Sequence, residues 1–432
     1  MASPTPLIER VDIQGSRMRV RASSALRPYL DGDFEVSYSD DVDLRAVPEQ
    51  IRLLPFIWNV AAIVWATDME LTVDTLDERV VRSFDEVRDV LRKFYPSLAW
   101  RGAIRAETVV RTPDPAPTQF TEAARFSGGV DSTFTALRHS GKHLLLITIW
   151  GTNVRLSDKR GWAAFEAANQ RSADDYAGGL AVIRSNIRSV DYLRLRALSP
   201  EISSWWVQVQ HGMAYSGVTA PLLYRHGITR LHVASGATEG YTGRQAATPE
   251  LDDPMSLGTA HVHHDGYEVS RQDKIRSIVN HVREHDVPAP HLRVCTNNLR
   301  KGSANCGWCE KCVRTTVAVF VEGGNPVEYG FPQFGPQWQD ELKQKLARYR
   351  WKFRPYQVYA WRVVQSNIQP ASENEPSFLT WLRDFDFEEY AASAPIRRIS
   401  RRRRIALGTR VPALFSVARA VTRLRKRLLP KD

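Results

Sequence analysis

The chain has 432 residues, 43% of them hydrophobic and 25% charged, which is typical of a globular protein of two or three domains. No apolar run reaches the ~18 residues needed to cross a bilayer, and no secretory signal is visible, so we expect a cytoplasmic protein. The net charge of +11 does not by itself indicate a nucleic-acid-binding protein. Residues 396–432 hold 13 Lys and Arg against one Asp, which gives this segment +12 and the rest of the chain −1.

Residues 1–115 contain short alternating apolar runs at 8–13 and 18–22, and a helix is expected around 84–94. The segment ends in a proline-rich stretch, 112–118, of the kind that links domains. No residue in it suggests a chemical role. We predict a small α+β domain here.

Strand-like and helix-like segments alternate between residues 119 and 290. Leu144–Trp150 is a continuous apolar run, as in strands buried on both faces of a parallel sheet, and 180–183 and 231–234 are weaker versions. Helices are predicted at 132–139, 162–176, 204–226 and 271–285. The alternation predicts a doubly wound α/β fold with a parallel sheet.

The sequence Ser127-Gly128-Gly129-Val130-Asp131-Ser132 separates a short strand, expected at 123–126, from a helix. The two glycines allow a tight turn and a close approach of the backbone to an anion, whose charge the amides and the helix dipole stabilise. Both serine hydroxyls can donate to phosphate oxygens. Asp131 suggests a Mg²⁺ ion between carboxylate and phosphate. The alternative is a glycine turn in which Asp131 or Ser132 only caps the helix.

This loop resembles the SGGxDS signature of the PP-loop ATP pyrophosphatases. Members of that superfamily cleave ATP between the α and β phosphates and transfer AMP to a carbonyl or carboxylate oxygen. The resemblance implies a sheet of the HUP type and an ATP site formed by residues 127–132. Asp131 and Ser132 of this loop are candidate catalytic residues. Lys274 is a third candidate, as a cation that could stabilise the adenylate transition state.

All four cysteines lie between Cys295 and Cys312, in the pattern Cys295-x10-Cys306-x2-Cys309-x2-Cys312. So tight a group in a chain without a secretory signal indicates a metal site. Four thiolates form a closed tetrahedral Zn²⁺ site, which is structural because no position remains for substrate. An Fe–S cluster is the competing prediction, and free buried thiols are the third.

The sequence from Cys306 to Arg314, CGWCEKCVR, is similar to the cysteine segment of the 7-cyano-7-deazaguanine synthases. Residues 231–243, with Glu239, and 271–275 also resemble segments of that family, and the likeness covers about 119–325. The family's substrate loop is not evident at 242–254, and residues 1–115 and 331–432 have no counterpart. The resemblance therefore implies adenylation chemistry but not the deazaguanine substrate.

If all four cysteines bind the metal, no cysteine is left to carry a persulfide sulfur. Attack of ammonia or an amine on the adenylate is then favoured, which predicts an ATP-dependent ligase acting on a small-molecule carboxylate or carbonyl. Two alternatives stay open. One is a tRNA-modifying enzyme, including sulfur transfer if the metal is iron, and the other is a non-catalytic nucleotide-binding scaffold.

Further residues have both a functional and an ordinary interpretation. Arg244, Lys274 and His211 could contact an ATP phosphate or could be surface and packing residues. On a strand, His261 and His263 would share one face and could bind a second metal, whereas the alternative is a solvated loop.

The last part of the chain is expected to be helical over 331–395 and strongly basic over 396–432. Apolar residues recur at helical spacing between 411 and 428, with Lys and Arg around them. A basic amphipathic helix suits an anionic inner membrane surface, and RNA is the second candidate partner. A solvated tail is the third possibility.

Overall fold

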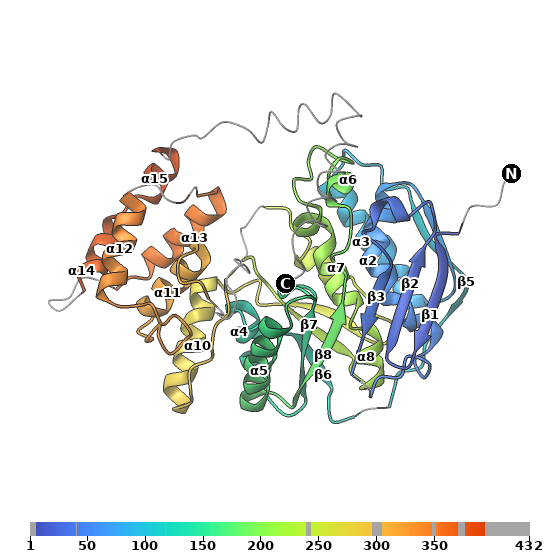
Figure 1. Ribbon diagram of the computed structural model, residues 1–432, viewed down its shortest axis with the longest axis horizontal. Coiled ribbons are helices and arrows are strands. Elements are labelled where there is room, and N and C mark those ends of the chain that lie inside the picture. The colour runs from blue at the N-terminus through green and yellow to red at the C-terminus, as the bar shows by residue number, and fades with distance from the viewer. Residues whose placement is uncertain are drawn as a thin grey trace.

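The computed structural model describes residues 6–39, 41–116, 118–238, 243–295, 305–347, 351, 353–369 and 376–393. An eight-stranded, mostly parallel sheet lies at its centre, and the helices of the last third of the described chain form a separate group to one side of it (Figure 1). Glu239 and the basic segment 396–432, which carry earlier predictions, lie outside the described residues. Within the described ranges, no helix combines the length and the apolarity needed to cross a bilayer.

The sheet has the order β1-β2-β3-β8-β7-β6-β9-β10. Its strands are β1 (Ile8–Gln14), β2 (Arg17–Ala22), β3 (Phe34–Ser37), β6 (Glu122–Arg125), β7 (Leu144–Trp150), β8 (Gly179–Ser185), β9 (Arg230–Ala234) and β10 (His261–Asp265). From β8 to β10 all neighbours are parallel. From β6 the chain moves first to β7 and β8 on one side and then to β9 and β10 on the other. The order therefore reverses between β6 and β9, where α/β sheets commonly bind ligands at the carboxyl ends of the strands.

Helices cover both faces of the parallel strands. On one face, Ala124, Leu144 and Leu146 pack with residues of α4 (Val130–Arg138) and α5 (Lys159–Tyr176). On the other, Ala123, Leu145 and Ile147 belong to a larger core shared with α2 (Leu54–Ala66), α7 (His211–Gly217) and α8 (Ala220–Arg225). Burial on both faces accounts for the continuous apolar run of β7.

Residues before the proline-rich stretch belong to the same sheet and core. The antiparallel strands β1, β2 and β3 join it through the pairing of Val36 with Ser185 of β8. In β2 every second residue is buried, which gives the strand one apolar face toward the shared core. The sheet and its core thus run across the domain boundary expected at residue 115.

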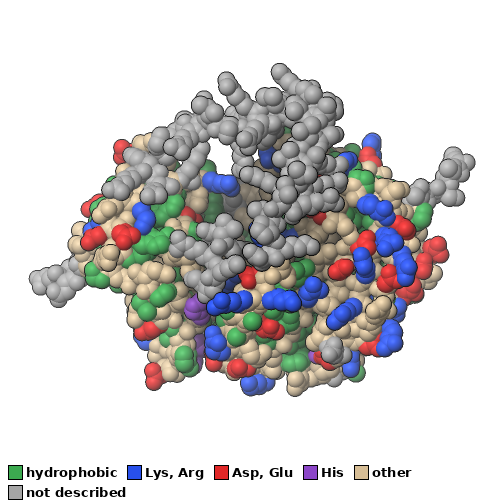
Figure 2. Space-filling model, in the orientation of Figure 1, with side chains coloured by type: hydrophobic (Ala, Val, Ile, Leu, Met, Phe, Trp, Pro, Cys, Tyr) green, Lys and Arg blue, Asp and Glu red, His purple; other side chains and the backbone are tan. Residues whose placement is uncertain are grey.

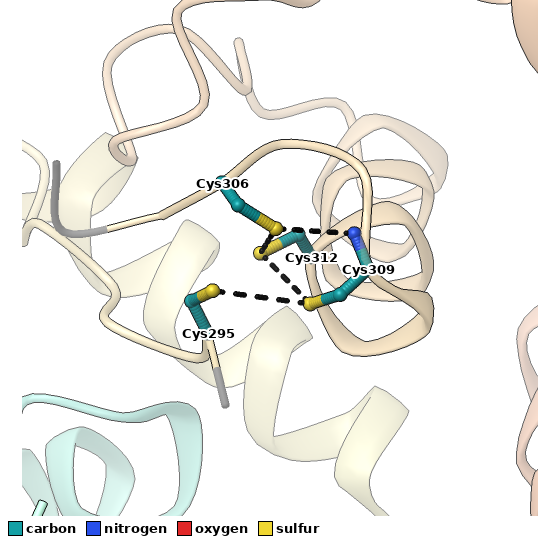
Figure 3. A group of neighbouring side chains, drawn as sticks. All are labelled: Cys295, Cys306, Cys309 and Cys312. Carbon is teal, nitrogen blue, oxygen red and sulfur yellow. Dashed lines mark hydrogen bonds between the residues drawn. The ribbon is translucent and has the colours of Figure 1, made fainter. Parts of the chain in front are cut away.

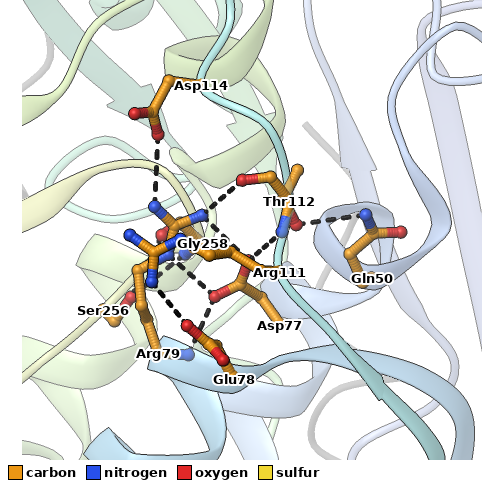
Figure 4. Close-up of polar contacts among 9 residues, drawn as sticks. All are labelled: Gln50, Asp77, Glu78, Arg79, Arg111, Thr112, Asp114, Ser256 and Gly258. Atoms are coloured by element: carbon orange, nitrogen blue, oxygen red, sulfur yellow. Dashed lines mark hydrogen bonds and ion pairs between the residues drawn. The ribbon is translucent and has the colours of Figure 1, made fainter.

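A second, two-stranded parallel sheet pairs β4 (Glu70–Asp77) with β5 (Ala103–Val110), and α3 (Glu78–Phe94) connects them. Asp77 joins the three elements, as Figure 4 shows. Its buried carboxylate caps α3 by accepting from Arg79 N at 2.8 Å and also accepts from Thr112 N at 2.8 Å. The Arg79 guanidinium lies 2.9 Å from the same carboxylate and donates to Thr112 O.

The remaining helices are α1 (Glu49–Arg52), α6 (Tyr192–Arg196), α9 (Pro249–Asp252), α10 (Arg271–His285), α11 (Glu310–Val321), α12 (Pro336–Ala347), α13 (Pro355–Ser366), α14 (Ser377–Asp384) and α15 (Phe387–Ser393), with a 3₁₀ turn at Arg27–Tyr29 and a π-helix at Trp206–Gln210. Helices α10 to α15 share a second core rich in aromatic side chains, among them Trp338, Trp361 and Phe387. Strand β7 and helix α10 match the predicted spans. The single helix predicted at 204–226 is wrong: the segment divides into the π-helix, α7 and α8, and Pro221, which has no N–H, lies in the first turn of α8.

Candidate functional site

The glycine loop, residues 127–132, follows β6 at the point where the strand order reverses. Gly128 has φ +67, in the left-handed region. A Cβ at Gly129 would lie 3.3 Å from Arg293 O, and Arg293 N donates to Gly128 O at 2.6 Å. The loop is therefore packed against the chain that leads to the cysteines, and the two glycines make that approach possible.

The N-cap of α4 is Gly129, and no side chain caps this helix. The alternative in which Asp131 or Ser132 serves only as a helix cap is therefore wrong. Ser132 Oγ lies 3.2 Å from Ser127 Oγ and 3.3 Å from Ser127 N, and it donates to Gly129 O at 3.2 Å. Ser132 is buried and braces the loop from within, whereas Ser127 faces the cavity beside it.

A cavity of about 410 Å³ lies beside the glycine loop. Its described lining residues are Ser127, Gly129, Val130, Asp131, Asn153, Arg188, Arg271, Arg293, Val294, Cys295, Lys311 and Thr315. Four of these side chains are cationic and one is a carboxylate. On the face seen in Figure 2, Lys and Arg side chains gather across the middle of the molecule. A concave, cationic surface next to backbone amides at a helix N-terminus suits a polyphosphate.

Asp131 lies between two basic side chains of α10. Arg271 donates to both of its carboxylate oxygens, from Nε at 3.3 Å and from Nη2, and Lys274 Nζ lies 3.8 Å from Oδ1. Burial raises the pKa of Asp131, but the charges of Arg271 and Lys274 outweigh it and leave the pKa below its ordinary value. Asp131 is thus an ionised carboxylate already paired with Arg271. Direct Mg²⁺ binding by Asp131 stays a prediction, because a carboxylate that accepts hydrogen bonds can also bind a metal ion.

Lys274 is almost fully buried and donates to Ser235 O at 2.8 Å. Burial lowers its pKa, an effect that Asp131 opposes and Arg271 reinforces. Lys274 therefore lies close to the Asp131 carboxylate, but it is not among the described residues that line the cavity.

Helix α11 connects the cavity with the cysteines. Lys311 and Thr315, four residues apart, line the cavity from one side of the helix. Cys312 and Thr316 lie one residue further along, and Cys312 belongs to the cysteine group. Burial and the nearby charge of Arg271 lower the pKa of Lys311.

The four cysteines come together as predicted, and Figure 3 shows their sulfurs pointing toward one another. All four Sγ atoms lie within 4.8 Å of one another, with Cys309–Cys312 at 3.4 Å, Cys306–Cys312 at 3.9 Å and Cys295–Cys309 at 4.0 Å. Metal–sulfur bonds of ~2.3 Å in a tetrahedron require sulfurs about 3.8 Å apart. The group can therefore hold a single metal ion. Cys309 N donates to Cys306 Sγ at 3.2 Å, which stabilises a thiolate.

Asn305 fixes the two arms of the cysteine group to each other. Its Nδ2 donates to Leu292 O at 2.7 Å and to Gly330 O at 3.0 Å, and its Oδ1 accepts from Val294 N and Cys295 N. Asn305 is not a residue that the cysteine spacing points to. Its position directly before Cys306 was the one available signal.

Several predicted residues lie elsewhere, and several site residues were missed. Arg244 lies 3.5 Å from Glu201, and His211 is buried with its pKa lowered to about 4 by burial and by Arg125. Neither is among the described residues that line the cavity. The four cations that line the cavity were not predicted as site residues: Arg188, Arg271, Arg293 and Lys311. Lys311 lies within the cysteine motif itself, which was a usable signal.

Comparisons of the chain with models of protein families, with curated proteins and with solved structures found no match.

Proposed function

We propose that the protein is an ATP-dependent ligase that adenylates a carboxylate or carbonyl oxygen of a small molecule, releases pyrophosphate, and forms a C–N bond with ammonia or an amine. The observation that carries this proposal is the cationic cavity at the glycine loop, at the switch point of the parallel sheet. The strand order β8-β7-β6-β9-β10 supports a HUP-type sheet as its scaffold.

In this proposal the loop amides and the N-terminus of α4 bind the pyrophosphate that leaves. Arg188, Arg271, Arg293 and Lys311 offset its negative charge from around the cavity. Because the leaving group gains charge as the bond to the α phosphorus breaks, fixed cations stabilise the transition state more than the bound nucleotide. Asp131 holds Arg271 in place, since it accepts two hydrogen bonds from the guanidinium.

We further propose that the cysteine group binds Zn²⁺, which would serve as a structural ion. Four sulfurs close the coordination shell, so the ion contributes stability and no open position for substrate. It would hold the first turn of α11, and therefore Lys311, against the glycine loop. Commitment of every cysteine to the metal favours a nitrogen nucleophile over a persulfide.

The test is pyrophosphate release from ATP by the full chain, with panels of small carboxylic acids and with ammonia or amines. Acid-dependent release, lost in Arg271→Ala and kept in the exposed control Arg82→Ala on α3, is the expected result. Release that depends on tRNA instead would favour the RNA-modifying alternative. ATP binding without turnover on any panel member would favour the scaffold.

A further inference from the structure

A group of histidines and carboxylates lies on the sheet face covered by α4, away from the cavity. Glu122 is on β6, His232 on β9, and His263 and Asp265 on β10. In the parallel register His232 is the neighbour of both Ala124 and His263. Residues two apart on a strand share a face, so all four side chains lie on one side of the sheet. His139, at the C-terminal end of α4, joins them from the helix.

The group is separate from the glycine loop. Asp131 and His139 lie at opposite ends of α4, about 12 Å apart at the helical rise per residue. None of the five residues is among those described as lining the cavity. A ligand here would therefore not compete with a nucleotide for contacts.

The five side chains of this group are in close contact with one another. His232 Nε2 lies 3.0 Å from Glu122 Oε2, and His139 Nε2 lies 3.0 Å from Asp265 Oδ1. The rings of His139 and His232 stack with centroids 3.8 Å apart, and the His263 ring stands edge-on to His232 at 5.5 Å. Potential ligand atoms of His232, His263 and Asp265 all lie within 4.8 Å of one another.

His232 is fully buried, yet its Nδ1 has no hydrogen-bond partner among the described residues. An unpaired polar atom in the interior costs about 1–3 kcal/mol, so a buried ring nitrogen without a partner needs an explanation. The opposite nitrogen, Nε2, faces the Glu122 carboxylate. Metal-binding histidines commonly have this arrangement, in which one nitrogen binds the metal and the other pairs with a carboxylate.

The Asp265 carboxylate is held from α4. Its Oδ2 accepts from Thr135 Oγ1 at 2.5 Å, and its Oδ1 lies 3.6 Å from Arg138 Nη1 as well as close to His139. Carboxylates that bind metals are commonly hydrogen-bonded in this way.

We propose that His232, His263 and Asp265 form a second metal site for a divalent transition-metal ion such as Zn²⁺, which two imidazoles and one carboxylate can bind. Glu122 and His139 are positioning residues that orient His232 and Asp265. Three protein ligands leave a fourth position for water. Because the His263 side chain is 50% exposed, the ion can enter from solvent and exchange more readily than one held by four buried sulfurs.

The test is a Co²⁺ titration of the metal-stripped full chain, followed by Zn²⁺ competition. The cysteine group would give an intense thiolate charge-transfer band, whereas the second site would give only weak visible bands. Two equivalents are expected for the unmodified chain. His263→Ala should bind one equivalent fewer and keep the charge-transfer band. Cys309→Ser should lose the charge-transfer band and keep the weak visible bands of the second site. His261→Ala is the matched control, since His261 is an exposed histidine on the same face of β10, and should keep both.

Glu122→Gln probes positioning without removing a ligand. It should weaken the second equivalent by about 10- to 100-fold and leave the first unchanged. Circular dichroism of each variant separates lost binding from lost folding. The proposal is overturned if the folded, unmodified chain binds only one equivalent, the one that gives the thiolate charge-transfer band. It is also overturned if His263→Ala still binds the second equivalent with unchanged affinity.

Discussion

The Asp131 carboxylate accepts two hydrogen bonds from the Arg271 guanidinium and so joins the first turn of α4 to the first turn of α10. Lys274, one turn further along α10, approaches the same carboxylate. The position of the cation nearest the glycine loop thus depends on an acidic residue of that loop.

Replacing Asp131 by Asn should separate binding from turnover. The change removes a negative charge from a cationic cavity, so ATP should bind at least as tightly as before. Arg271, no longer held by a charged partner, should lose its alignment, and pyrophosphate release should fall by about 10²- to 10³-fold. Calorimetry with ATP and a pyrophosphate assay measure the two effects. Asp174→Asn, at an exposed position on α5, is the control; equal losses of binding and turnover would contradict this role for Asp131.

Lys311→Met should weaken ATP binding without loss of metal. Lys311 faces the cavity, while its neighbour Cys312 faces the other sulfurs. We expect about a tenfold weaker affinity, which corresponds to the loss of one charge-assisted contact of ~1.4 kcal/mol. The dependence of affinity on salt should also become shallower. Lys142→Met, at the amino end of β7, should change neither, and metal analysis of both variants should match the unmodified chain.

The purified protein should be colourless and contain zinc bound by the cysteines. Cys309→Ser should remove that ion, lower the melting temperature, and weaken ATP binding as well, because α11 carries both Cys312 and Lys311. Metal analysis, calorimetric melting and ATP titration test the three consequences. A brown protein that contains iron and sulfide would contradict the zinc assignment and favour sulfur transfer.

Asp77→Ala should destabilise the fold strongly. It leaves Arg79, which is only 10% exposed, without its main partner and removes the cap of α3. Breaking a buried ion pair costs about 3–5 kcal/mol, to be measured by urea unfolding. The exposed ion pair between Asp89 and Arg92, on the same helix, offers a control. Asp89→Ala should lower the free energy of unfolding by less than ~1 kcal/mol.

The Asp77 carboxyl group also makes the stability of the fold depend on pH. Burial raises the pKa of Asp77, but hydrogen bonds from Arg79 and Thr112 outweigh it and lower the pKa in the folded state. A lowered folded-state pKa means that the stabilisation is complete above the unfolded pKa of ~3.9 and is lost as the pH falls through the folded value. The free energy of unfolding should therefore fall with acid more steeply in the unmodified chain than in Asp77→Ala.

Local patterns gave the predictions that were confirmed. The apolar run of β7 and the span of α10 matched the structure, and the cysteines come together as their spacing predicted. Prediction failed where contacts join distant segments. Arg293 and Arg188 reach the cavity from loops with no pattern of their own, and the pairing of Glu122 with His232 spans 110 residues. The pairing of β3 with β8 could not be predicted either. The four residues of β3 alternate in burial, but such a short pattern does not specify a partner strand.

The β3–β8 pairing also bears on how the chain reaches its folded state. Ser185 Oγ donates to Glu35 O, and the two residues are 150 positions apart. During synthesis the first three strands therefore emerge long before their partner edge exists. Pairings this distant slow folding and expose unpaired strands to aggregation. A recombinant fragment that begins after the proline-rich stretch would leave the edge of β8 open, so we expect it to be recovered poorly from cells unless residues 6–116 are supplied alongside it.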